Sequence, residues 1–326
     1  ISHRINQDMK NILVITLSNI GDVIMTTPVI MALAVQFPDA RITVLVGPKA
    51  YPILEKSKHI HQLVAYHKKA GFIAKWKLLQ TLKRNHYDCI VDLRNTPITA
   101  LISCKKHSPV SRRFRKTNMR ERHLEILEMM GLGVPNPPPF QFFDATDEQS
   151  GLAALQNRGI AETEGWIMAA PGAASAKKRW PATYFQDVIR PLAVGMGKKV
   201  LLIGAGNERP IAEAVGQGLA DAVVLCGETT LPETAALLAK AALVLANDSA
   251  IMHLGFELGV PTVGIFGPTD HEKYGHASEK FRIACEEVVA CSCHSQRRPY
   301  AERDCFHGLG PEKVLRLCTE LLLAQS

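Results

Sequence analysis

The sequence has little charge, few aromatic residues and no long apolar run. Charged residues make up 21% of its 326 residues and aromatic residues 6%. No uncharged apolar stretch reaches the roughly 18 residues that a membrane-spanning helix needs. A transmembrane protein, a coiled coil, collagen and a disordered chain are therefore not expected. The first residues also lack the basic, apolar and small-residue order of a secretory signal, so we expect no export by this route.

The length and the 47% apolar content are sufficient for two globular domains. The formal net charge of +7 is concentrated in residues 105–122, which hold eight Lys or Arg residues against one Glu. This pattern predicts a local anionic partner, although a solvated surface would look the same. The segment contains a single aromatic residue, Phe114, so we do not expect it to bind nucleic acid.

The eight cysteines do not form a recognisable metal motif. Four are dispersed and are typical of reduced thiols in the cytoplasm: Cys89, Cys104, Cys226 and Cys318. The others fall late in the chain without the paired C-x2-C spacing of zinc sites: Cys285, Cys291, Cys293 and Cys305. Free thiols, a disulfide or a bound metal remain open for this second group. No D-x-D pair occurs, so we expect neither a metal held by two close carboxylates at the candidate site nor another cofactor.

Short apolar runs alternate with helical patterns along both halves of the chain. Predicted strands cover residues 11–17, 41–46 and 88–93, then 166–170, 199–203, 222–225, 243–246 and 261–266. Such alternation predicts two doubly wound parallel α/β sheets of the Rossmann-like type, facing a cleft. We expect the first domain at residues 1–150, the second at 151–310, and a last helix at 311–326 that packs back on the body.

Ligands of such sheets bind at the carboxyl ends of the strands, so the loops there are the candidate site. After the first strand, Gly21 permits a tight turn and Asp22 is either a carboxylate base or a helix cap. The loop at 171–181 combines Gly172 with three basic residues that suit a phosphate, among them Lys178, or form a charged surface.

Two further loops lie in the second half. The loop at 203–210 has Arg209 where a dinucleotide fingerprint would have its third glycine, which argues against an oxidoreductase; Glu208 there could bind ribose. At 245–270, Asp248 and Ser249 open a helix whose free N–H groups would attract an anion, unless they are simple caps. A Ser–His–Asp hydrolase is not supported, because the nucleophile elbow is missing.

The order of these motifs resembles glycosyltransferase family 9, the ADP-heptose:lipopolysaccharide heptosyltransferases with the GT-B fold. The resemblance spans about residues 10 to 325 and rests on GDVIMTTP, PGA with KKRWP, NDSAIMHL and FGPTD. It implies an inverting, metal-independent transfer of heptose from ADP-heptose to a lipid A core. We also expect a cytoplasmic enzyme, peripheral on the inner leaflet of the membrane.

The resemblance also implies roles for individual residues. Asp22 would be the general base on the acceptor, and Lys178 would contact the donor diphosphate. The implied donor-binding residues are Gly172, Lys178, Glu208, Thr229, Leu231, Asp248, Ser249, Ala250 and His253, with Ala250 in place of the family's glycine. The implied acceptor-binding residues are Arg112, Arg113, Arg115, Lys116 and Arg120. A nucleotide-sugar or polyanion binding protein without transfer activity, and a transferase for another nucleotide sugar, remain the alternatives.

Overall fold

The computed structural model describes residues 9–16, 19–133, 136–286 and 306–324. The chain divides into two compact units, Ile1–Phe142 (unit 1) and Phe143–Ser326 (unit 2). This division lies a few residues before the expected boundary at residue 150. Helix α8 (Ala145–Gln156) accounts for the difference, because it packs against helix α11 (Leu231–Ala239) of unit 2.

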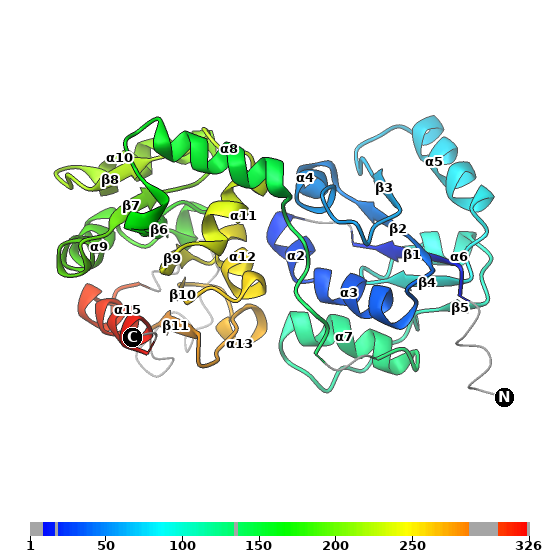
Figure 1. Ribbon diagram of the computed structural model, residues 1–326. Coiled ribbons are helices and arrows are strands. Elements are labelled where there is room, and N and C mark those ends of the chain that lie inside the picture. Colours follow the sequence, from blue (N-terminus) through cyan, green and yellow to red (C-terminus); the bar gives the residue numbers. More distant parts are fainter. Residues whose placement is uncertain (1–8, 17–18, 134–135, 287–305, 325–326) are drawn as a thin grey trace. The chain divides into compact units, whose positions relative to one another are not determined.

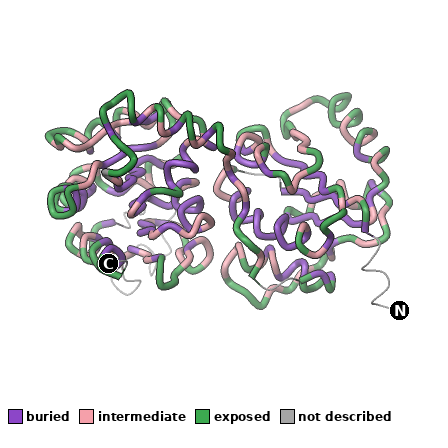
Figure 2. The backbone as a smooth tube through the Cα atoms, viewed as in Figure 1, coloured by how far each residue is buried: buried purple, intermediate pink, exposed green. Residues whose placement is uncertain are grey.

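Unit 1 is built on a five-stranded parallel sheet in the order β3-β2-β1-β4-β5 (Figure 1). Its strands are β1 (Asn11–Ile15), β2 (Arg41–Val46), β3 (Gln62–Ala65), β4 (Cys89–Asp92) and β5 (Lys106–His107). The central strand is a continuous apolar run because helices cover both of its faces, and Ile12 to Ile15 are fully buried (Figure 2).

The helices of unit 1 are α2 (Ile20–Ile24), α3 (Thr27–Gln36), α4 (Tyr51–Leu54), α5 (Phe72–Arg84), α6 (Ile98–Leu101) and α7 (Met119–Met129), with a 3-10 turn at Pro48–Ala50. In helix α3, Pro28 occupies the first turn, where no backbone N–H is needed. Helix α7 begins at Asn118, whose side chain accepts hydrogen bonds from the N–H groups of Arg120 and Glu121.

Unit 2 contains a six-stranded parallel sheet in the order β11-β10-β9-β6-β7-β8. Its strands are β6 (Trp166–Ala170), β7 (Lys199–Leu202), β8 (Ala222–Val224), β9 (Leu243–Asn247), β10 (Thr262–Phe266) and β11 (Phe281–Cys285). The remaining helices are α9 (Ala182–Met196), α10 (Arg209–Gly216), α12 (Ala250–Leu258), α13 (His271–Tyr274) and α15 (Pro311–Leu323), with 3-10 turns at Glu162–Glu164, Ala176–Lys178 and Gly206–Glu208. The C-terminal α15 packs against α9 and β11.

Both units are doubly wound parallel α/β folds, so the predicted fold class is confirmed. In unit 1 the strand order reverses between β1 and β4, and in unit 2 between β6 and β9. Crevices at such switch points, outside the carboxyl ends of the strands, are where open α/β sheets bind ligands. None of the helices in the described ranges has both the length and the apolarity to cross a bilayer.

Candidate functional site

The switch point of unit 2 is bridged by an ion pair between two predicted site residues. Lys178 ends the 3-10 turn after β6, and Asp248 follows β9 directly. The Nζ atom of Lys178 lies 2.7 Å from Oδ2 of Asp248, whose side chain is 5% exposed. The structure therefore brings together two residues that are 70 positions apart in the chain.

Asp248 holds further side chains in addition to Lys178. The hydroxyl of Thr269, in the loop after β10, donates to Oδ2 of Asp248 at 2.6 Å. The other oxygen, Oδ1, lies 3.9 Å from Nε2 of the buried His253. A buried carboxylate with these neighbours fixes the position of the lysine ammonium, which has three donors and can still offer hydrogen bonds to a ligand.

The N-terminus of α12 lies next to this carboxylate. Ser249 is the N-cap residue, but its side chain makes no capping hydrogen bond. Its Oγ atom is buried and has no hydrogen-bond partner among the described residues. The first N–H groups of a helix are unpaired and carry the positive end of its dipole. Together these groups are suited to an anion, and the unused hydroxyl is a donor that a bound phosphate would satisfy.

Asn247, which the sequence analysis does not single out as a site residue, fixes the loop that carries Lys178. It is fully buried at the end of β9, and its Nδ2 donates to the carbonyl of Pro171 at 2.8 Å. Its Oδ1 accepts from the N–H of Trp180 at 3.2 Å. The sequence gives one indication of this role: Asn247 is a polar residue at the end of a strand that is buried on both faces. A buried amide is stable there only if it forms hydrogen bonds.

Gly172 and Glu208 are adjacent in space. A Cβ atom on Gly172 would lie 2.3 Å from the carboxyl carbon of Glu208, which is too close for any real contact. The carboxylate is held there by the N–H of Ala205, which donates to Oε2 at 2.8 Å. Glycine after β6 therefore leaves the space that the Glu208 side chain, from the loop after β7, occupies, and a Cβ at this position would displace the carboxylate.

Thr229 lies in the loop between β8 and α11, Leu231 is the first residue of α11, and both are partly exposed. Thr229 shares a hydroxyl contact of 2.9 Å with Thr234, and Thr230 caps α11 through a capping box with Glu233. The loops after β7 and β8 run side by side, since the N–H of Gly227 donates to the carbonyl of Gly204. The predicted donor-binding residues thus follow one another along the carboxyl edge of the sheet in unit 2.

In unit 1, Asp22 lies in the short helix α2 after β1. Asn19 is the N-cap residue, and its Nδ2 contacts the Asp22 carboxylate at 3.4 Å. No backbone N–H from the described ranges donates to Asp22, so the alternative interpretation as a helix cap has no hydrogen bond to support it there. The carboxylate is partly exposed and remains available to a ligand.

A cavity of about 300 Å³ lies beside the switch point of unit 1. It is lined by residues that follow β4 and β5 and by residues of α7: Leu93, Arg94, Asn95, Val110, Arg112, Phe114, Met119, Arg122, His123 and Ile126. Three of these are arginines, so the cavity is suited to an anionic ligand. Arg94 and His123 are functional candidates that sequence reasoning missed, whereas Arg122 belongs to the predicted basic segment 105–122 but not to the implied acceptor-binding residues.

The charged residues around this cavity affect the pKa of His123. Burial, together with the charges of Arg94 and Arg112, lowers the pKa of the imidazole to about 4, although the hydrogen bond to the carbonyl of Met25 and the charge of Asp22 oppose the shift. His123 is therefore neutral at physiological pH. Arg112 is fixed by the carbonyls of Pro109 and Asp92, at 2.6 and 2.5 Å, and burial lowers its pKa.

The other predicted acceptor-binding residues do not line the cavity. Arg115 pairs instead with the buried Glu125 at 3.0 Å and with Glu128 at 2.9 Å. Hydrogen bonds with Glu125 raise the pKa of Arg115. Arg113 and Lys116 are exposed, and Arg120 lies in the first turn of α7. Part of the charge of residues 105–122, that of Arg115, is thus balanced by carboxylates of α7.

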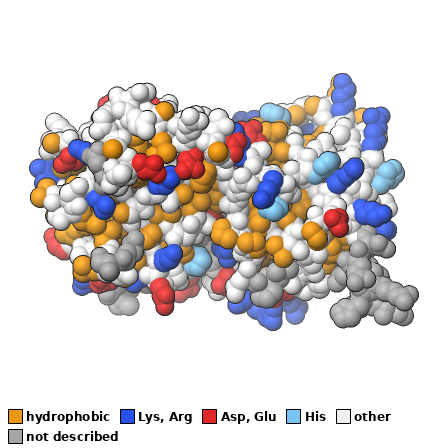
Figure 3. Space-filling model, viewed as in Figure 1, with side chains coloured by type: hydrophobic (Ala, Val, Ile, Leu, Met, Phe, Trp, Pro, Cys, Tyr) orange, Lys and Arg blue, Asp and Glu red, His pale blue; other side chains and the backbone are white. Residues whose placement is uncertain are grey.

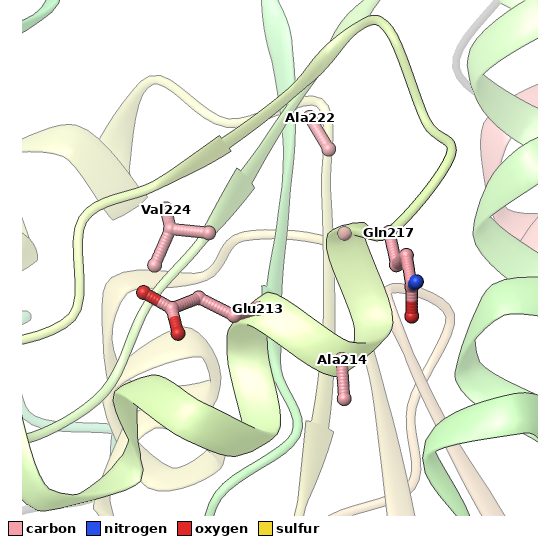
Figure 4. Close-up of a pocket in the computed structure, with 6 residues that line it drawn as sticks. Glu213, Ala214, Gln217, Ala222 and Val224 are labelled. Carbon is pink, nitrogen blue, oxygen red and sulfur yellow. The ribbon is translucent and has the colours of Figure 1, made fainter.

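Other features of the molecule offer less chemistry. Within the described ranges, no group of three or more His, Cys, Asp or Glu side chains could hold a metal ion. Cys285 is the last residue of β11 and is partly buried, and Cys291, Cys293 and Cys305 lie outside the described residues. A second cavity, of about 410 Å³, lies between α10 and the edge strand β8, and Glu213 is the one charged residue in its lining (Figure 4).

Comparisons with known proteins connect these features to one family. The model of glycosyltransferase family 9 (heptosyltransferase) matches residues 75–303. Lipopolysaccharide heptosyltransferase 3 of Escherichia coli is 28% identical over 280 residues, which cover 77% of this chain and 82% of that protein. A family 9 glycosyltransferase of Veillonella parvula has a TM-score of 0.83 at 22% identity, covering 98% and 99% of the chains. ADP-heptose lipopolysaccharide heptosyltransferase II of E. coli has a TM-score of 0.76 at 22% identity, covering 97% and 99%.

Proposed function

The chain belongs to glycosyltransferase family 9, the heptosyltransferase family, and from this premise we propose that it transfers heptose from ADP-heptose to the inner core of lipopolysaccharide. The family confirms the expected enzyme class, a glycosyltransferase. The two E. coli relatives are named for lipopolysaccharide, and one of them is named for ADP-heptose as well. The acceptor would be the anionic lipid A core at the inner leaflet of the cytoplasmic membrane.

The donor half of the proposal is supported by the ion pair at the switch point of unit 2. Lys178 and the first N–H groups of α12 would bind the diphosphate, with the unpartnered hydroxyl of Ser249 as a further donor. Glu208 would accept hydrogen bonds from the ribose, and Thr229 and Leu231 would border the adenine. This order follows the order of the loops along the sheet edge.

The acceptor half is supported by the arginine-lined cavity in unit 1 beside Asp22. We propose that Asp22 takes the proton of the acceptor hydroxyl while the oxygen of that hydroxyl forms a bond to the anomeric carbon of the donor. The bond from this carbon to the diphosphate breaks at the same time, and ADP leaves from the opposite face. A single displacement inverts the configuration. Lys178 and the α12 amides would stabilise the charge that builds on the leaving phosphate, without a metal ion.

The test is a transfer assay with a panel of nucleotide sugars and truncated lipopolysaccharides, read by mass spectrometry. We expect addition of one heptose from ADP-heptose, an inverted anomeric configuration by NMR, and undiminished turnover in excess chelator. Nucleotide-sugar binding without any product would favour a binding protein instead. Transfer of another sugar would correct the donor, a retained configuration would exclude single displacement, and loss of turnover in chelator would exclude the metal-free mechanism.

A further inference from the structure

Helix α5 exposes a compact group of large apolar side chains. Phe72 is 80% exposed, Ile73 71% and Trp76 52%, and the rings of Phe72 and Trp76 stack with centroids 6.5 Å apart. At 3.6 residues per turn these three side chains fall within an arc of about 100°. Figure 2 shows the start of the helix as exposed.

These side chains are not needed to attach α5 to unit 1. A neighbouring face of the helix does so, because Leu82 is fully buried in the cluster on one face of the sheet, and Leu78 and Leu79 pack against that cluster. The exposed group is therefore a second apolar face on a helix that is already anchored. A contiguous apolar patch of this kind on a folded protein marks an interaction site.

The charge around this face has one sign only. Residues 67–86 contain no Asp or Glu and six basic residues: Lys68, Lys69, Lys75, Lys77, Lys83 and Arg84. None of the six forms an ion pair with a described residue. Figure 3 shows Lys and Arg side chains gathered where Figure 1 places α5. Exposed aromatic residues among unpaired lysines are the composition of helices that lie in a membrane interface.

We propose that α5 docks unit 1 on an anionic lipid bilayer, with Phe72, Ile73 and Trp76 inserted among the headgroups and the lysines above them. Tryptophan favours this interfacial depth, and lysines near the surface are attracted to anionic lipids. Protein interfaces, in contrast, are depleted of lysine at their centres. The inference deepens the proposed function, since an acceptor carried by a membrane requires an enzyme at its surface. It also moves the attachment away from residues 105–122, where Arg115 is already paired with carboxylates.

The chain contains its own probe for this proposal. It has three tryptophans, and Trp166 and Trp180 are 0% and 1% exposed, so a change in emission on vesicle binding reports Trp76. We expect a blue shift and co-sedimentation with vesicles of phosphatidylcholine and phosphatidylglycerol, both weakened by high salt. Vesicles of phosphatidylcholine alone should bind at least about tenfold more weakly. Equal binding to both, or no blue shift with either, would overturn the proposal.

A double substitution, Phe72→Ser with Ile73→Ser, keeps Trp76 and every charge. We expect it to weaken binding to the anionic vesicles at least about tenfold, because the apolar contribution is lost. Val194→Ser removes a comparably exposed apolar side chain from α9 and should bind like the wild type, and so should Arg113→Gln. Equal melting temperatures would establish that the double variant is folded.

The same double variant separates this inference from the proposed function. It should retain wild-type turnover on a delipidated acceptor in solution, where no membrane is needed. Vesicle binding without any heptose transfer would contradict the proposed function but would still support membrane docking through α5. If the double variant binds anionic vesicles as tightly as the wild type, the proposal that α5 docks on the bilayer is wrong. If wild-type protein self-associates through this face and ignores vesicles, the face is a protein interface and the proposal fails.

Discussion

Replacing Gly172 by alanine should separate nucleotide binding from folding. The added Cβ would lie 2.3 Å from the carboxyl carbon of Glu208 and 2.5 and 2.7 Å from its oxygens. Ordinary contact needs about 3.4 Å or more, so the carboxylate must move by about 1 Å. It can do so because it is the end of a flexible side chain, but the 2.8 Å hydrogen bond from the N–H of Ala205 is then lost.

The magnitude follows from what this carboxylate is proposed to bind. Loss of a hydrogen bond to a charged group costs about 1.5–3 kcal/mol, which corresponds to roughly 10- to 150-fold in ADP affinity if Glu208 binds the ribose. The loss in the free energy of unfolding should be smaller, about 1 kcal/mol, because the side chain is partly exposed. Titration calorimetry with ADP and urea denaturation measure the two quantities.

A matched control and a double-mutant cycle make the reasoning refutable. In Gly195→Ala the new Cβ meets no atom within 4 Å, so ADP affinity should be unchanged and α9 slightly stabilised. On a Glu208→Ala background, Gly172→Ala should cost almost nothing, since the side chain that it displaces is gone. Wild-type ADP affinity in Gly172→Ala, or effects that simply add in the double variant, would refute the role of Glu208.

Four further expectations concern the two switch points. Asp22→Asn should leave ADP affinity unchanged but lower turnover at least about 10²-fold, as for loss of a general base; near wild-type turnover would remove that role. Lys178→Ala should weaken ADP binding roughly 10- to 150-fold in calorimetry, and unchanged affinity would contradict the diphosphate contact. Arg112→Gln should raise the acceptor KM at least about fivefold while Arg115→Gln leaves it unchanged, and the reverse order in steady-state kinetics would count against the cavity. His123 binds a proton less readily in the folded protein, with a pKa of about 4 against about 6.5 when unfolded, so the stability present above pH 6.5 should fall as the pH drops towards 4. This loss should reach about 2 kcal/mol at pH 5 in urea denaturation, and His123→Gln should abolish it.

The sequence is sufficient to predict the elements whose apolar pattern is continuous. Strand β6 has the predicted bounds, because its apolar run is buried on both faces of the sheet. Three strands are not evident in the pattern: β3, β5 and β11. Each is an edge strand with partly exposed side chains, so neither alternation nor a continuous run marks it.

Some features of the candidate site, too, can be predicted from the sequence, and others cannot. That Lys178 and Asp248 belong near one another follows from the rule that loops after parallel strands share an edge. The close approach of the Glu208 side chain to Gly172 does not follow from this rule, because it depends on how two separate loops pack. The cavity of unit 1 is also a tertiary result, since Arg94 follows β4 whereas His123 comes from α7.

A comparison of two buried aspartates shows why topology locates a site without defining its chemistry. Asp92 ends β4 and Asp248 follows β9, so each lies beside the switch point of its sheet. Asp92 accepts hydrogen bonds from residues 94, 96 and 99 of its own loop, which fixes that loop. Asp248 accepts instead from the side chains of Lys178 and Thr269, which belong to two other loops. The carboxylate at this position therefore fixes the segment that follows it in unit 1, whereas in unit 2 it orients the ammonium group of another loop.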